Sequence, residues 1–174
     1  VARPVQVILD ESIDLPGPSV HVIPHREIRI PLRAPGVLED GYLSADPWMY
    51  FYFKGLCLLG IYTLRAGLPA AGHRIFGEIS SPNLVLPPWF FEGACALLYS
   101  SYTGTRITDP YHTAIFRASV PGDISQVSNH PGRWPGYHAY RVYGIPFMEW
   151  ILSRYGWEKI REFLLVHGGG ELAV

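Results

Sequence analysis

Glu92 is the residue whose surroundings most clearly suggest chemistry. It lies in the apolar segment PPWFFEGACAL, residues 87–97. Proline is favoured in the first turn of a helix, because its missing N–H would have no partner there, so the pair Pro87-Pro88 indicates a helix start. An ionised carboxylate among apolar residues requires a cation or strong hydrogen-bond donors nearby. We therefore expect a buried helix whose carboxylate faces such a group.

Other groups that could bind a metal have unfavourable spacing. His21 and His25 are four residues apart, but they fall in a segment that alternates like a strand. In an extended chain these positions are about 13 Å apart, too far to share one ion. Cys57 and Cys95 could form one disulfide in an oxidising compartment or join Glu92 in a soft-metal site, but two buried thiols packing as small apolar groups are the commoner arrangement.

The segment around Glu92 resembles the second metal-ligand helix of gluzincin metallopeptidases, in particular the peptidase-MA-like domains. The shared pattern is Pro-x-Trp, two apolar residues, Glu-Gly-x-Ala, here running from Pro87 to Ala94. In that family the glutamate is the third zinc ligand. The other two ligands come from a HExxH helix that follows Asp-x-Trp, and Asp46-Pro47-Trp48 is present here. The phrase Tyr-Gly-x-Glu-Lys-Ile at residues 155–160 is also similar, so the resemblance spans about residues 5–168.

The HExxH motif itself is missing at the matching place. The chain reads Lys54-Gly55-Leu56-Cys57-Leu58 there. Zinc catalysis of this type needs two histidines one helical turn apart and a glutamate that accepts the proton of the metal-bound water. Leu58 cannot bind a metal and Gly55 carries no base. We therefore expect no catalytic residues and no resident metal or other cofactor.

Lys54 has two interpretations. In the first, its ammonium replaces the lost ion and pairs with Glu92 between the two helices. In the second, Lys54 extends to solvent along its aliphatic stem and Glu92 forms local hydrogen bonds. The first predicts a strongly coupled pair of residues and the second does not.

The resemblance also indicates which residues line the former active-site cleft. Trp89 and Tyr143 are expected there, together with His138 and the Gly- and Pro-rich loop at residues 121–136. The function we expect is that of an inactive metallopeptidase-like domain, acting as a structural or peptide-binding module of a larger protein. The alternative is a zinc-dependent peptidase with a rebuilt metal site.

The amino-acid composition and the spacing of apolar residues predict the fold that positions these side chains. The chain has 174 residues, of which 48% are hydrophobic and 17% charged, which is typical of a folded domain with a substantial core. β-branched runs predict short strands within about residues 4–31. One of these strands is expected at Glu27–Ile30. Helical patterns follow over about 44–168, with starts expected near Ser44 or Asp46, Pro88, Asp109 and Pro146. Glycines are expected to end or interrupt helices near residues 67, 104 and 156, a connector is expected at 73–77, and the glycines at 168–170 are expected to break the chain. We predict an α+β fold in one domain, residues 1–174: a small N-terminal β-sheet packed on a mostly helical zincin-like body.

Charge and hydropathy limit the partners. A net charge of about −1 provides no basic field for nucleic acid. The apolar run at 48–64 contains Lys54 and falls short of the roughly 20 residues that span a bilayer. Both ends look cut from a longer polypeptide. The resemblance implies an extracytoplasmic protein with further domains, such as a β-propeller, and a peptide or protein ligand.

Overall fold

The protein is described by a computed structural model covering residues 4–12, 17–36, 46–77, 81–105, 110–119, 134–136 and 138–170. The described chain forms two compact units. The first contains residues 1–85 and 158–174, and the second contains residues 86–157. A small N-terminal sheet combined with many helices confirms the predicted α+β fold. The expectation that residues 1–174 form one gluzincin-like domain stays a prediction.

The first unit begins with a three-stranded sheet. Strands β1 (Gln6–Asp10), β2 (Ser19–His21) and β3 (Glu27–Pro31) lie in the order β1-β3-β2. β1 pairs with β3 in parallel and β2 pairs with β3 antiparallel. On the central strand, Ile28 and Ile30 are buried while Glu27 and Arg29 are half-buried, which is the alternation that predicted this strand.

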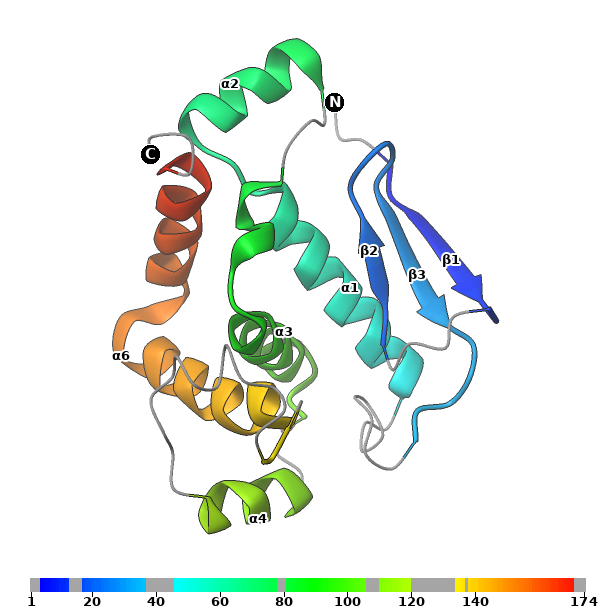
Figure 1. The fold of residues 1–174 in the computed structure, drawn as a ribbon, viewed down its shortest axis with the longest axis vertical. Coiled ribbons are helices and arrows are strands. Elements are labelled where there is room, and N and C mark those ends of the chain that lie inside the picture. Colours follow the sequence, from blue (N-terminus) through cyan, green and yellow to red (C-terminus); the bar gives the residue numbers. More distant parts are fainter. Residues whose placement is uncertain are drawn as a thin grey trace. The chain divides into compact units, whose positions relative to one another are not determined.

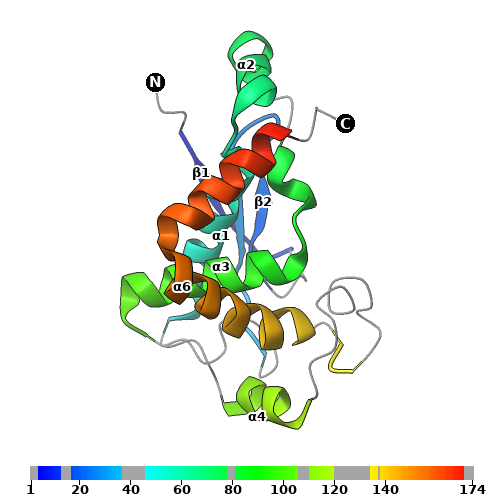
Figure 2. The same ribbon diagram turned by 90° about the vertical axis from the view of Figure 1, so that its left-hand side faces the viewer.

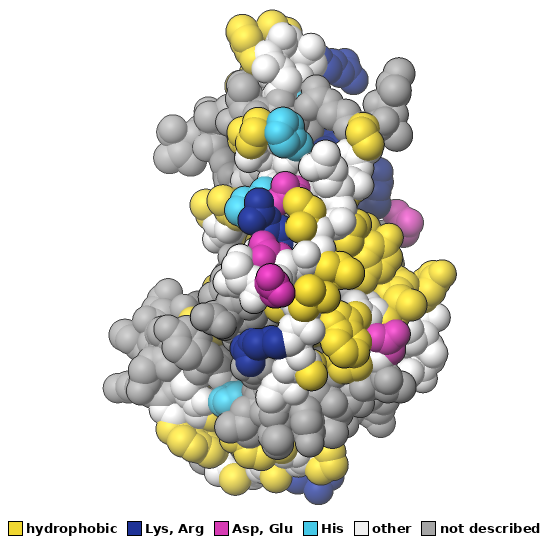
Figure 3. Space-filling view, turned by 90° about the vertical axis from the view of Figure 1, so that its right-hand side faces the viewer, with side chains coloured by type: hydrophobic (Ala, Val, Ile, Leu, Met, Phe, Trp, Pro, Cys, Tyr) yellow, Lys and Arg dark blue, Asp and Glu magenta, His cyan; other side chains and the backbone are white. Residues whose placement is uncertain are grey.

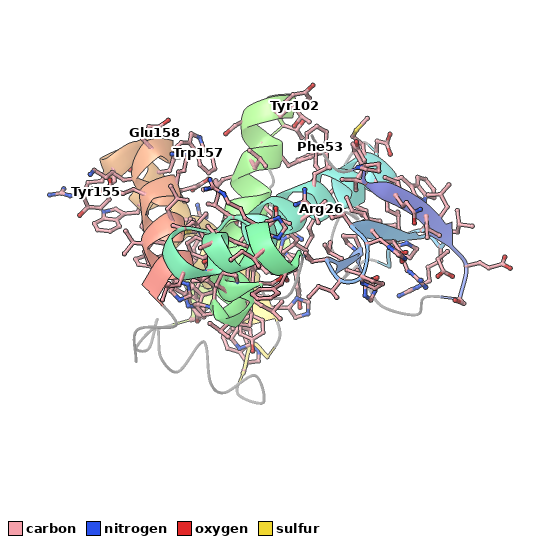
Figure 4. All side chains as sticks on the ribbon, turned by 90° about the horizontal axis from the view of Figure 1, so that it is seen from above. Arg26, Phe53, Tyr102, Tyr155, Trp157 and Glu158 are labelled. Carbon is pink, nitrogen blue, oxygen red and sulfur yellow. The ribbon has the colours of Figure 1, made fainter. Side chains whose placement is uncertain are left out.

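Helix α1 (Pro47–Thr63) covers one face of this sheet (Figure 1). Asp46 caps it as predicted: its carboxylate accepts a hydrogen bond from the backbone N–H of Met49 at 3.0 Å. α1 is followed by helix α2 (Gly67–Phe76) and the short 3₁₀ helix η1 (Pro82–Val85). Phe53 extends from α1, and Arg26 lies in the turn before β3 (Figure 4).

Polar side chains of Asp10, Ser12 and Arg29 form a cluster at one end of the sheet. Ser12 donates two hydrogen bonds to the Asp10 carboxylate, from its N–H at 2.8 Å and its hydroxyl at 2.6 Å, and Arg29 approaches the same carboxylate at 3.4 Å. The bonds from Ser12, and then the Arg29 charge, lower the pKa of Asp10. The paired Glu27 carboxylate raises the pKa of Arg29. Charged side chains therefore lie beside the exposed apolar residues of β1, Val7 and Leu9, and Figure 3 shows charged and hydrophobic areas side by side on this face.

The second unit contains helices α3 (Pro88–Thr103) and α4 (Pro110–Ala118) and the first part of α6 (His138–Gly170). α3 ends where predicted, because Gly104 adopts the left-handed conformation with φ 70°. The first part of α6 crosses α3 (Figure 2). Gly156, with φ 75° and ψ 169°, interrupts α6 at the predicted break, and Tyr155 and Trp157 project outward on either side of it (Figure 4).

Two local predictions are wrong. Residues 67–76 form helix α2, although His73–Gly77 were expected to form part of a connector; α1 itself ends at Thr63, close to the expected end near Arg65. Pro69 lies in the first turn of α2, where its missing N–H costs no helical hydrogen bond. The second correction concerns α6, which begins at His138 and so places Pro146 inside a helix instead of at its start.

Within the described parts of the chain, no single helix has the length and apolar character of a membrane span. α1 and α2 pass that test only as a pair, and they are bent by 97° relative to each other.

Candidate functional site

Helix α3 holds Glu92 in a tightly packed backbone. Pro87 is the N-cap residue and Pro88 occupies the first helical position, as the sequence predicted. Glu92 is half-buried, and Gly93 beside it is buried. A Cβ atom added at Gly93 would lie only 2.5 Å from the carbonyl oxygen of Gly144 and 2.5 Å from Cγ of Met148, both on α6. Gly93, next to Glu92, therefore lies at a close contact between α3 and the first part of α6 within the second unit.

Lys54, Gly55 and Leu58, which the resemblance aligns with the HExxH motif, lie on the buried side of α1. Lys54 is only 7% exposed, Gly55 is buried, and Leu58 is 9% exposed. Lysine is rarely buried to this extent. Leu58 thus packs as an ordinary core residue, whereas Lys54 brings a cationic side chain into the interior.

Gly55 is in contact with the sheet. A Cβ atom added at this position would overlap Cγ2 of Ile28, a fully buried residue at the centre of β3. The absence of a side chain at residue 55 is therefore what allows α1 to lie this close to β3. Any larger residue, including a glutamate, requires Ile28 or the helix to move.

This contact predicts opposite effects for one substitution at two places in α1. We expect Gly55→Ala to lower the free energy of unfolding by about 1–3 kcal/mol, because it overpacks the helix–sheet contact. Gly60→Ala should raise it by up to about 1 kcal/mol, because an added Cβ there meets no atom within 4 Å and alanine is the better helix former. Urea denaturation of the two variants measures both values. Equal effects at the two positions would contradict the close packing at Gly55.

Lys54 and Glu92 belong to different units, Lys54 to the first and Glu92 to the second. Their pairing therefore stays a prediction, which mutational coupling can test. The burial of Lys54 favours the interpretation in which its ammonium has an anionic partner over one in which it extends into bulk water.

The three residues expected to line a cleft each have aromatic neighbours in the second unit. Trp89 packs edge-on against Phe147, with 5.2 Å between ring centroids. Tyr143 contacts Phe116 of α4 at 6.1 Å. His138 lies against His112, also of α4, with ring centroids 5.4 Å apart. Of the loop expected beside them, residues 121–133 lie outside the described part of the chain.

The remaining candidates have no special arrangement. Cys57 and Cys95 are both buried, unbridged thiols. His21 and His25 are exposed on and after β2. Among the described residues, no group of three or more histidine, cysteine, aspartate or glutamate side chains is arranged to hold a metal ion.

Sequence reasoning missed a buried polar cluster around Asn83 in the first unit. Asn83 is completely buried, and its Nδ2 donates to the carbonyl oxygens of Ile61 at 3.1 Å and Leu64 at 3.0 Å. Its Oδ1 lies 3.0 Å from Nδ1 of His167. The side chain thus supplies donors to two carbonyls at the end of α1, where backbone acceptors run short of helical partners; that of Ile61 also accepts from the N–H of Leu64 at 3.3 Å.

The glycines after His167 complete this cluster. A Cβ at Gly168 would lie 3.0 Å from the carbonyl oxygen of Leu64, and one at Gly169 would lie 3.2 Å from Cβ of Ala66. The glycine run, which looked like a chain break in the sequence, is the close contact between the end of α6 and the end of α1. No local pattern predicts this contact, because Gly168 and Leu64 are 104 positions apart in the chain.

Comparisons with protein-family models, with curated proteins and with solved structures find no match to this chain. The gluzincin resemblance therefore rests on the motifs around Asp46–Trp48 and Pro87–Ala94.

Proposed function

We propose that this chain is a catalytically inactive relative of the peptidase-MA-like gluzincins that serves as a structural or peptide-binding module of a larger protein. The observation that carries the proposal is the contact between Gly55 and Ile28. In the resemblance, residue 55 takes the place of the glutamate that activates water. Here the space of its side chain is occupied by the core of the sheet, so regaining that base requires repacking as well as substitution.

The buried side chains on either side of Gly55 support the same proposal. Lys54 and Leu58 stand in place of the two histidine ligands. The ammonium of Lys54 cannot coordinate zinc while protonated, and its charge repels a divalent cation. A buried cation next to a core leucine is instead suited to neutralising a carboxylate, which is the role that the metal would have played toward Glu92.

A row of aromatic rings in the second unit supports the binding part of the proposal. Trp89 packs on Phe147, Phe147 stacks on Trp150 with an angle of 8° between the rings, and Trp150 meets Tyr155 edge-on. Trp150 and Tyr155 are each 51% exposed. Exposed tryptophan and tyrosine side chains held by ring contacts offer large, rigid contact areas to a peptide at low entropic cost. Partner domains in the same chain, a β-propeller among them, and an extracytoplasmic location belong to this proposal through the resemblance.

A cleavage assay tests the central statement. The purified chain is incubated with a complex peptide mixture, with and without added zinc, and the products are identified by mass spectrometry. We expect no cleavage beyond that of an identical sample of heat-denatured protein. Zinc-dependent cleavage that is lost in Glu92→Gln would overturn the proposal and establish a peptidase with a rebuilt metal site.

A further inference from the structure

Two histidines face each other in the second unit. His112 lies on α4 and His138 is the first residue of α6, and both are half-buried. Nε2 of His112 is 3.4 Å from Nδ1 of His138. The residues are 26 positions apart in the sequence and match no metal-binding spacing, so the arrangement is visible only in the fold.

A single tyrosine contacts both imidazole rings. The ring of Tyr111 lies edge-on to His112, with centroids 5.4 Å apart and an angle of 79°, and edge-on to His138 at 5.8 Å and 82°. The start of α6 is fixed by a turn in which the N–H of Ala139 donates to the carbonyl of Gly136 at 3.0 Å. The Tyr111 ring therefore packs against both imidazoles, and the backbone turn fixes the start of the helix that carries His138.

The distance between the two nitrogens suits a metal better than a direct hydrogen bond. Hydrogen bonds from ring N–H groups are usually 2.7–3.2 Å long, so 3.4 Å is long for a contact between two imidazoles. In tetrahedral zinc coordination, bonds of 2.0–2.1 Å place two nitrogen ligands about 3.3–3.4 Å apart. A separation of 3.4 Å therefore matches the spacing of two ligands on one ion and is long for a direct hydrogen bond.

We propose that Nε2 of His112 and Nδ1 of His138 bind a divalent transition-metal ion of the kind that prefers imidazole, with zinc as the representative. Neutral imidazole is a good ligand for zinc, copper and nickel. The proposal assigns two protein ligands to the ion and leaves its other positions to water, so binding is reversible and weaker than at a four-ligand structural site.

The proposal is independent of the inactive site inferred above. The metal site involves neither Glu92 nor any residue of α1. An inactive gluzincin relative could have this site or be without it. A zinc titration therefore needs variants that separate the two locations.

The test is titration of the full chain with zinc, followed by calorimetry. We expect one zinc ion per chain, with affinity lowered at least about tenfold in both His112→Ala and His138→Ala, since loss of even an outer-shell partner of a metal ligand costs that much. His25→Ala, which removes an exposed histidine of the first unit, is the matched control and should bind as the unmodified chain does, as should Glu92→Gln. Circular dichroism checks that each variant is folded, and His112→Gln and His138→Gln replace any alanine variant that is not.

Cobalt provides a second readout that does not depend on affinity alone. Co²⁺ bound tetrahedrally by the two imidazoles should give intense visible absorption in the unmodified chain and in His25→Ala, and this absorption should be absent in both site variants. Undiminished zinc binding by His112→Ala and His138→Ala, or no binding by the unmodified chain, would overturn the inference. If zinc binding were lost in Glu92→Gln but kept in His112→Ala, both this inference and the proposed function would be overturned.

Discussion

The predicted pairing of Lys54 with Glu92 implies that Lys54→Ala and Glu92→Ala each lower the free energy of unfolding by about 3–5 kcal/mol, because each would leave one member of a buried ion pair without its partner. Lys54 is only 7% exposed and Glu92 is half-buried, so water can replace the missing partner only incompletely. The double variant should be milder than the sum of the two single effects, because neither charge then remains buried alone. Urea denaturation of the four proteins measures this coupling.

The chain supplies a matched control in Lys159 and Glu162. These side chains form an ion pair of 2.6 Å on the surface of α6, where each is about 60% exposed. The same cycle of alanine variants there should give single effects and a coupling below about 1 kcal/mol. Lys54→Met, which keeps the aliphatic stem, separates loss of charge from loss of packing. Strictly additive effects of Lys54→Ala and Glu92→Ala would contradict the pairing, and Glu92 would then have to be stabilised by local hydrogen bonds.

The second large effect is expected at Asn83. Asn83→Ala should lower the free energy of unfolding by about 3 kcal/mol, because it removes the amide that donates to the carbonyls of Ile61 and Leu64 from a completely buried position, and only the Ile61 carbonyl also accepts from the Leu64 N–H. It also leaves His167 without the oxygen that lies 3.0 Å from its Nδ1. Chemical denaturation measures the loss, and faster amide exchange at the end of α1 should accompany it.

Ser153→Ala is the comparison for Asn83→Ala. The Ser153 hydroxyl also donates to a helix carbonyl, that of Trp150 at 2.9 Å, but at an exposed position where water can replace it. We expect a change within about 1 kcal/mol there. If Asn83→Ala were as mild as Ser153→Ala, the polar cluster would be an incidental contact and not the cap of α1.

The elements that sequence reasoning located have strong local causes. Asp46 before a proline marks the start of α1, the two prolines mark the start of α3, and glycines end or interrupt helices at residues 104 and 156. The alternation of apolar residues around Ile28 located the central strand. Each of these signals acts over a few residues, so it can be recognised in the sequence without knowledge of the tertiary structure.

The features that sequence reasoning missed depend on residues far apart in the chain, or on a residue that is compatible with two different local structures. Pro69 can end a helix or lie in the first turn of the next one, and only the fold distinguishes the two. Asn83 and His112 looked ordinary in the sequence because their partners, His167 and His138, come much later in the chain. The burial of Lys54 could be proposed from the apolar residues around it, but the reason that residue 55 must be glycine lies in Ile28 of another element.

The order in which the two units are encoded affects how the protein can be synthesised. Residues 86–157 are continuous, whereas the first unit combines residues 1–85 with residues 158–174. A chain emerging from the ribosome therefore completes the second unit first and can close the first unit only after passing the bend at Gly156. Gly168 and Gly169, which lie against the end of α1, follow the whole of the second unit in the chain. Until they appear, the Asn83 cluster lacks its covering helix, so this end of α1 is the part of the nascent protein that a chaperone or a protease would find open.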